Sequence, residues 1–109
     1  MSWTIKAFET KRGEKPVEEF IKSLNEQTIA KIVHTIDLLE KYGPFLGMPH
    51  TKKLTSELYE LRIRGKQEVR IIYGFIEKNI YLLHCFKKQT QKTPKKEIET
   101  AMSRLIIAP

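Results

Sequence analysis

Basic side chains gather in one short segment of this sequence, in an arrangement suited to binding phosphate. The segment 87–96 holds five lysines and no acidic residue: Lys87, Lys88, Lys92, Lys95 and Lys96. It follows a strand-like stretch and precedes a helical pattern, which places the charge at the lip of a sheet. Lysines there would bring salt-sensitive affinity for a polyanion, because each phosphate contact releases condensed counterions. A solvated loop is the alternative explanation.

Three arginines alternate with apolar residues in two strand-like stretches and therefore face away from the apolar set. They are Arg62, Arg64 and Arg70. If the stretches pair as neighbouring strands, these arginines and Glu60 converge, since diagonal neighbours lie within about 8 Å. The guanidinium fork binds phosphate through two hydrogen bonds, so Arg62 and Arg70 are predicted to form a phosphate clamp. For each arginine alone, an exposed ion pair with Glu60 or Glu68 is equally consistent.

Three residues are candidates for moving protons at such a site. Cleaving RNA without a metal requires a base for the 2′-hydroxyl, positive charge for the phosphorane and an acid for the leaving 5′-oxygen. Lys88 ranks first for proton transfer. His84 is also a candidate, although a hydrogen-bonded structural histidine is the commoner case in a nearly apolar strand. Glu60 is the third, with a structural ion pair as its alternative role.

Composition favours a nucleic-acid partner. The 109 residues include 20 Lys and Arg against 13 Asp and Glu, a formal charge of +7, and a basic protein with clustered charge has the electrostatic footprint of nucleic-acid binding. A membrane partner is disfavoured, because no basic amphipathic helix with a bulky apolar face is present. Neither a signal peptide nor a membrane span is evident, so a cytoplasmic location is expected.

No cofactor or metal is expected. The sequence has neither a glycine-rich phosphate loop before a helix nor a Gly-x-Ser-x-Gly elbow. Cys85 is the single cysteine, which rules out an intramolecular disulfide and a cysteine-based zinc site. His34 and His50 have no partners at metal-ligand spacing.

Hydrophobic periodicity predicts a single α+β domain over residues 1–109. The expected elements are a strand at 3–8, a helix from Pro16, a helix at 26–42, a loop at 45–51, strands at 58–64, 68–76 and 80–86, and a last helix with Thr93 as N-cap. Short turns make the last three strands an antiparallel meander. The early helices should cover one face of a mostly antiparallel sheet, with the strand 80–86 in its middle.

The second half of the chain resembles the RelE/ParE toxin superfamily, and within it the HigB-like, phage-related branch. The similarity is carried by four segments and extends in weaker form over residues 3–105: Leu58-Tyr59-Glu60-Leu61-Arg62, Val69-Arg70-Ile71-Ile72-Tyr73, Leu82 to Pro94, and Glu97-Ile98 with Ala101. It implies a RelE-like microbial RNase fold of the order strand, two helices, three-stranded meander and helix.

The resemblance also implies a function. RelE-like members are toxins of type II toxin-antitoxin pairs that cut messenger RNA on the ribosome without a metal and so inhibit translation. Arg62, Arg70 and Lys88 match basic positions of the family. Glu60 stands where RelE itself has a lysine, and the aromatic residue of RelE's last helix has no clear counterpart near Glu97.

Several partners and two other functions follow from the same resemblance. A helix-turn-helix antitoxin, the ribosome and messenger RNA are the expected partners, with DNA bound only indirectly through the antitoxin. Arg64, Lys87, Lys92, Lys95 and Lys96 are expected to contact RNA. The alternatives are a ParE-like toxin that poisons gyrase, which needs no phosphate clamp, and a basic RNA-binding module without catalysis.

Overall fold

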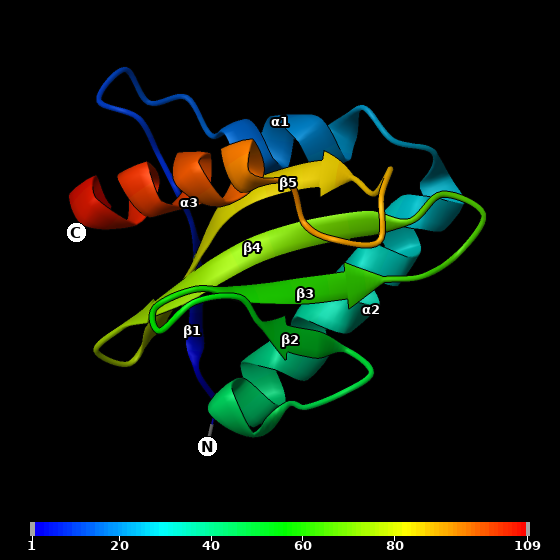
Figure 1. Ribbon diagram of the computed structural model, residues 1–109, viewed down its shortest axis with the longest axis horizontal. Helices are drawn as coiled ribbons and strands as arrows, with labels where there is room; N and C mark the ends of the chain where they lie inside the picture. Colours follow the sequence, from blue (N-terminus) through cyan, green and yellow to red (C-terminus); the bar gives the residue numbers. More distant parts are fainter. Residues whose placement is uncertain (1, 109) are drawn as a thin grey trace.

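The computed structural model describes residues 2–108 as a five-stranded sheet with helices on both faces (Figure 1). Its elements in chain order are β1 (Thr4–Ala7), α1 (Pro16–Lys22), α2 (Glu26–Tyr42), the short 3₁₀ helix η1 (Gly43–Phe45), β2 (Thr51–Lys53), β3 (Tyr59–Ile63), β4 (Val69–Ile76), β5 (Asn79–Lys87) and α3 (Lys95–Ile107). The spatial strand order is β1-β5-β4-β3-β2. Strand β1 runs parallel to β5 and the other neighbours are antiparallel, which confirms the α+β class.

The helix α2 begins and ends where the sequence predicts. The side chain of Asn25 caps it by accepting a 2.8 Å hydrogen bond from the backbone N–H of Thr28. Gly43 ends it with a positive φ of 53°, a conformation that costs glycine little. The apolar periodicity of this helix would also place Val33 in the core, but Val33 is 51% exposed. No helix within residues 2–108 is both long and apolar enough to cross a membrane.

Three other sequence predictions need correction. The expected loop 45–51 begins with the last residue of η1, and its own last residue, Thr51, starts the edge strand β2, which is too short for its alternation to be read from sequence. Strand β4, rather than β5, is the middle of the sheet, because the order places two strands on each side of it. The N-cap of α3 is Pro94, and the hydroxyl of Thr93 is instead used by Glu60, as described below.

Two apolar layers hold the sheet between the helices. Helices α1 and α2 pack on one face over a core that includes Val17, Leu24, Ile32, Leu39, Leu61, Ile71, Tyr73 and Ile80. Helix α3 packs on the other face over a smaller core that includes Phe8, Leu58, Ile72, Leu83, Phe86 and Ala101. The smaller core covers only part of that second face, and the remainder carries the charged residues of β3 and β4.

An irregularity in β5 changes which residues face α3. The pairing with β4 passes from Ile72↔His84 to Tyr73↔Leu82, so one residue of β5 is extra. Leu83 and the neighbouring His84 therefore both contact the α3 side, Leu83 in the smaller core and His84 on Glu97. Bulges of this kind are known to redirect side chains beside functional sites.

Two buried titratable groups are structural. Burial raises the pKa of the Cys85 thiol to about 12, so this cysteine acts as a small apolar residue at neutral pH. Burial likewise raises the pKa of Tyr73 to about 12, and its hydroxyl lies 2.6 Å from the hydroxyl of Thr51. The hydrogen bond ties the edge strand β2 to the middle of the sheet.

Gly43→Ala is expected to destabilise the protein through the single tryptophan. A Cβ on Gly43 would lie 2.3 Å from Nε1 of Trp3, on a backbone that already has positive φ, and overpacking of this kind costs about 1–3 kcal/mol. Tryptophan fluorescence during urea unfolding should show a lower midpoint and a changed native spectrum. Gly47→Ala is the control, because its Cβ would meet nothing within 4 Å.

Candidate active site

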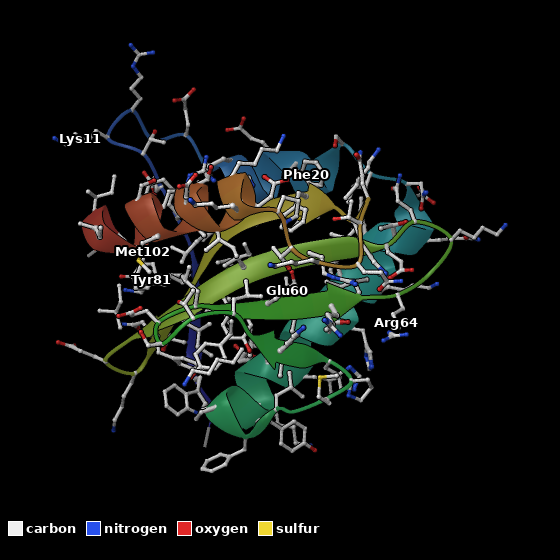
Figure 2. All side chains as sticks on the ribbon, in the orientation of Figure 1. Lys11, Phe20, Glu60, Arg64, Tyr81 and Met102 are labelled. Atoms are coloured by element: carbon white, nitrogen blue, oxygen red, sulfur yellow. The ribbon has the colours of Figure 1, made fainter. Side chains whose placement is uncertain are left out.

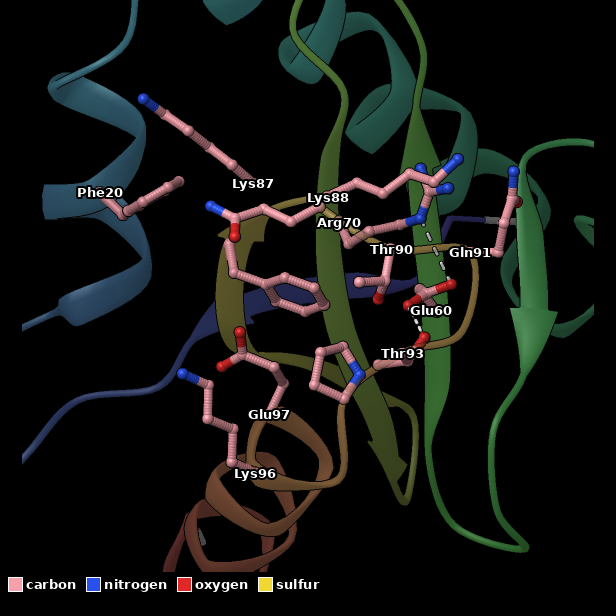
Figure 3. Close-up of a pocket in the computed structure, with 13 residues that line it drawn as sticks. Phe20, Glu60, Arg70, Lys87, Lys88, Thr90, Gln91, Thr93, Lys96 and Glu97 are labelled. Atoms are coloured by element: carbon pink, nitrogen blue, oxygen red, sulfur yellow. Dashed lines mark hydrogen bonds and ion pairs between the residues drawn. The ribbon is translucent and has the colours of Figure 1, made fainter.

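A polar cleft of about 510 Å³ opens on the part of the sheet that α3 leaves uncovered (Figure 3). Its walls come from the end of β5, the segment 88–94 and the first turn of α3. The lining residues used below are Glu60, Arg70, Phe86, Lys87, Lys88, Thr93, Lys96 and Glu97. The cleft therefore joins residues that are far apart in the chain, as the alternation of the strands predicts.

The predicted convergence of Glu60, Arg62 and Arg70 is present. Arg62 and Arg70 are directly opposite each other on β3 and β4, a placement that repels unless an anion lies between them. Glu60 supplies the anion, because its Oε1 lies 3.4 Å from Nε of Arg62 and 3.5 Å from Nε of Arg70. The carboxylate thus holds both guanidinium groups by their inner nitrogens.

Arg70 is buried rather than exposed, with 5% of its surface accessible. Among the buried side-chain nitrogen and oxygen atoms of residues 2–108, Nη1 of Arg70 is the one that makes no hydrogen bond. Nη1 forms an ion pair with Oε1 of Glu68, but the distance between the two atoms is 3.6 Å, too long for a hydrogen bond. An unsatisfied buried donor costs about 1–3 kcal/mol, more when charged, so this nitrogen is arranged for an acceptor.

The segment 88–94 explains why the arginine is buried. It turns back across β4 before α3 begins (Figure 1), and Thr93 donates a 2.5 Å hydrogen bond to Oε2 of Glu60. Glu60 is consequently 1% exposed and has partners on both oxygens. The carboxylate is committed to holding the arginines, which argues against its predicted role as a general base.

Lys88 lies beside the arginines at the mouth of the cleft. Its backbone N–H donates to the carbonyl of Glu68 at 2.9 Å, which continues the pairing of the strands by one residue. Its Nζ lies 3.6 Å from Oε1 of Glu68, the same oxygen that pairs with Nη1 of Arg70. Figure 3 shows the lysine side chain running next to that of Arg70. Glu68 thus links the two cations at the rim, where it is partly exposed.

His84 faces α3 and has contacts on both ring nitrogens. Its Nε2 lies 2.8 Å from Oε1 of Glu97, and its Nδ1 lies 3.3 Å from Nη1 of Arg104. A guanidinium group only donates, so Nδ1 accepts and the hydrogen on Nε2 is donated to Glu97. Arg104 is partly buried, which lowers its pKa from the usual value. The histidine does not line the cleft, whereas its partner Glu97 does.

The other predicted RNA-contacting residues are divided among four places. Lys87 and Lys96 line the cleft, while Lys95 is exposed at the start of α3 outside it. Lys92 lines a neighbouring hollow together with Lys52, Lys53 and Arg62. Arg64 does not join the arginine pair as predicted, and Figure 2 places it toward the end of the sheet, away from Glu60. The strand ends at Ile63, so its alternation no longer directs Arg64.

Sequence reasoning did not select Glu97 or Arg104 as functional. Both lie in α3, on the side that packs against β5. Their spacing of seven residues, two helical turns, was a usable signal, because it places them on one face of a helix. Strand alternation already places His84 on the same face as Phe86, but the sequence does not show that α3 covers it there.

Comparison with known proteins places the chain in a family. Residues 19–106 match the family described as phage derived protein Gp49-like (DUF891). The chain belongs to the phage-derived Gp49-like family. The match covers both halves of the fold, from α1 to the last turn of α3, and includes every residue of the cleft described above. It confirms the resemblance to the HigB-like, phage-related branch.

The chain is also similar in sequence to a curated protein that is named as a toxin. The chain is 36% identical over 63 residues to the "Putative toxin HigB3" of Mycobacterium tuberculosis (strain ATCC 25618 / H37Rv). The aligned region covers 54% of this chain and 54% of the relative. The match therefore spans about half of this Gp49-like protein and about half of its curated relative.

Proposed function

We propose that this Gp49-like protein is the toxin of a type II toxin-antitoxin pair and a ribosome-dependent, metal-independent messenger RNA endonuclease with a RelE-like fold. The observation that carries the proposal is the buried Arg70, which lines a cleft rimmed by lysines and whose Nη1 makes no hydrogen bond within the described residues, its ion pair with Glu68 being 3.6 Å long. A phosphodiester oxygen is an acceptor of the right charge. The toxin-like relative supports the same conclusion.

The arginine pair would bind the scissile phosphate. Glu60 occupies the Nε atoms of Arg62 and Arg70, which leaves their outer nitrogens for phosphate oxygens. These donors would stabilise the negative charge that develops on the phosphorane, and they are already oriented before the substrate arrives. Phosphate would also offset the repulsion between two opposed arginines. Lys88, beside Arg70, would add charge and protonate the leaving 5′-oxygen.

Glu97 is the best-placed general base. Its Oε1 accepts from His84, while the carboxylate lines the cleft with about a fifth of its side chain exposed. Oε2 is then available to take the proton of the 2′-hydroxyl. His84 would act as a positioning residue, held by Arg104 in the tautomer that donates to Glu97. His84 would therefore not exchange a proton with the RNA itself, as the sequence suggests, but would act through the carboxylate of Glu97.

The two other functions are tested against the same cleft. A gyrase poison acts by protein contact and has no use for an arginine pair with an unsatisfied donor, so the geometry favours RNA. A binding module without catalysis would keep the arginines but would not cleave. In vitro translation with a defined messenger RNA separates these functions: cleavage within ribosome-bound message supports the proposal, and protection without cleavage contradicts it.

A second test uses living cells and the antitoxin that we expect to be encoded beside this chain. Production of the chain alone in a growing bacterium in liquid culture should arrest translation in the cytoplasm, and co-production of a small helix-turn-helix neighbour should relieve the arrest. The two proteins should then elute together in size-exclusion chromatography. Separate elution with continued arrest would contradict the antitoxin partner, and normal growth on production of the chain alone would contradict the toxin.

Cleavage is expected to continue in excess EDTA. Arg62, Arg70 and Lys88 supply the positive charge that a divalent cation would otherwise bring to the phosphate. Because the proposed reaction depends on the ribosome and ribosomes need magnesium, the measurement follows the slow residual cleavage of a short RNA without ribosomes, at high protein concentration, and compares EDTA with added magnesium. A rate that vanishes with EDTA and returns with magnesium would show that the charge comes from a metal.

A further inference from the structure

A second basic hollow lies at the edge of the sheet, on the other side of Arg62 from the cleft. This edge groove has a volume of about 410 Å³ and lies between α2 and the end of β3. Its charged or titratable lining residues are Lys31, His34, His50, Arg62 and Arg64, and its lining contains no carboxylate. The other lining residues are Ala30, Thr35, Pro49 and Ile63, so the groove combines apolar surface with positive charge.

Apart from Arg62, which pairs with Glu60, the charged or titratable residues of the edge groove have no acidic partners among the described residues. Within residues 2–108, Lys31, His34, His50 and Arg64 take part in none of the ion pairs within 4.0 Å. Lys31 reaches from α2 to the turn after β3, where a Cβ on Gly65 would lie 2.6 Å from its Nζ. The ammonium group is thus brought next to Arg64 without a counter-charge, an arrangement that an anionic ligand would stabilise.

The groove is continuous with the candidate active site. Arg62 lines the edge groove and also the hollow that contains Lys92, and that hollow shares Gln91 and Thr93 with the cleft. The backbone N–H of Arg62 donates to the carbonyl of His50 at 2.7 Å, which fixes this residue at the junction. One chain of phosphates leaving the cleft past Arg62 would enter the edge groove next.

We propose that the edge groove binds the phosphates of the RNA strand one to three nucleotides away from the cleavage site. The inference rests on the proposed function for the class of substrate, but it concerns binding and not the chemical step. Lys31 and Arg64 each contact a backbone phosphate, and His34 and His50 line the path. Single-stranded RNA is the ligand because the groove is lined by cations, as electrostatic channels for single strands are.

The experiment compares two double variants that lose the same charge. Lys31→Gln/Arg64→Gln alters the groove, and Lys11→Gln/Arg12→Gln alters an exposed loop at the opposite end of the molecule, as the labels of Lys11 and Arg64 in Figure 2 show. Fluorescence anisotropy measures binding of uncleavable 2′-O-methyl oligonucleotides, a trimer and an octamer, over a range of salt. Cleavage is thereby kept out of the measurement.

The groove variant should lose two phosphate contacts to the octamer. The slope of log K against log salt should become less steep by about 1.4, since each contact to a single strand contributes about 0.7. Trimer binding should keep its slope. The loop variant should behave as the natural chain with both oligonucleotides. A charge-preserving Lys31→Arg/Arg64→Lys variant should retain the octamer slope and serves as a second test if the Gln variant unfolds.

Three results would overturn the inference. An equal decrease of the octamer salt slope in the groove variant and the loop variant would mean that RNA binding depends only on the net charge of the protein. An equal decrease of the salt slope for the trimer and the octamer in the groove variant would place Lys31 and Arg64 at the cleft itself. Competition by a poly-glutamate peptide as strong as that by the octamer at equal charge would assign the groove to an acidic protein segment. If the chain binds as expected but cleaves no RNA, the proposed function fails while the groove assignment stands.

Discussion

Replacement of Arg70 by alanine should lower the free energy of unfolding by about 3–5 kcal/mol and also abolish toxicity. The variant leaves Glu60, which is 1% exposed, with Arg62 as its single cationic partner, and breaking a buried ion pair by removing one partner has a cost of this size. Activity should fall at least about 10²-fold, as it does when one donor to a transition-state anion is lost. Urea unfolding and RNA cleavage are measured on the same preparation.

A second variant separates the loss of stability from the loss of activity. In Glu60→Gln/Arg70→Met the buried charge and its partner are both removed, while the carbonyl oxygen of the amide introduced at position 60 can still accept from Arg62 and its NH2 group can donate to the hydroxyl of Thr93. Replacing both members of a buried pair is often neutral for stability, so most of the lost stability should return without the activity. Arg12→Ala in an exposed loop is the control and should change neither quantity. An active double variant would show that Arg70 is structural.

The convergence of Glu60, Arg62 and Arg70 could be predicted because it depends on local alternation and a short turn. Side chains of a strand alternate between faces, and a hairpin fixes the register between neighbouring strands. The same reasoning could not reveal that Arg70 is buried. Its burial depends on the path of the segment 88–94 and on the contact between Thr93 and Glu60, which are 33 residues apart.

The path of the segment 88–94 also explains the misplaced helix cap. In isolation, a threonine before proline is a good N-cap with the proline at the first helical position. The buried carboxylate of Glu60 is a stronger acceptor than the backbone groups around it, since hydrogen bonds to charged groups are about twice as strong as neutral ones. Thr93 donates to Glu60, and the helix begins one residue later than predicted. A tertiary contact thus overrides the local capping preference.

The roles of His84 and Glu97 depend on what α3 places beside β5. His84 and Lys88 share a strand face, as the sequence suggests, because the bulge lies beyond His84 and brings only Leu83 to that face as well. The sequence does not show that α3 brings Glu97 onto His84. The apolar pattern of β5 is equally consistent with a regular strand and with a bulged one. Glu97 therefore became a candidate only when the packing of α3 was known, and its function leads to the second major prediction.

Glu97→Gln should reduce the rate of RNA cleavage by about 10²–10⁴-fold, the usual contribution of a general base. The amide keeps the size of the side chain and an oxygen that can accept from His84 Nε2, so the fold and RNA affinity should be preserved. Glu99→Gln, exposed on the same helix, is the matched control and should leave the rate unchanged. Single-turnover cleavage reports the chemical step, and uncleavable RNA reports affinity.

His84→Gln distinguishes a base from a structural carboxylate. If His84 positions Glu97, its loss should lower the single-turnover rate by less than Glu97→Gln does, and the double variant should be no slower than Glu97→Gln alone, because the two residues act as one unit. Additive losses would mean that the histidine acts independently on the substrate. A Glu97→Gln variant that cleaves at the natural rate would leave Lys88 as the group that moves protons in the cleft.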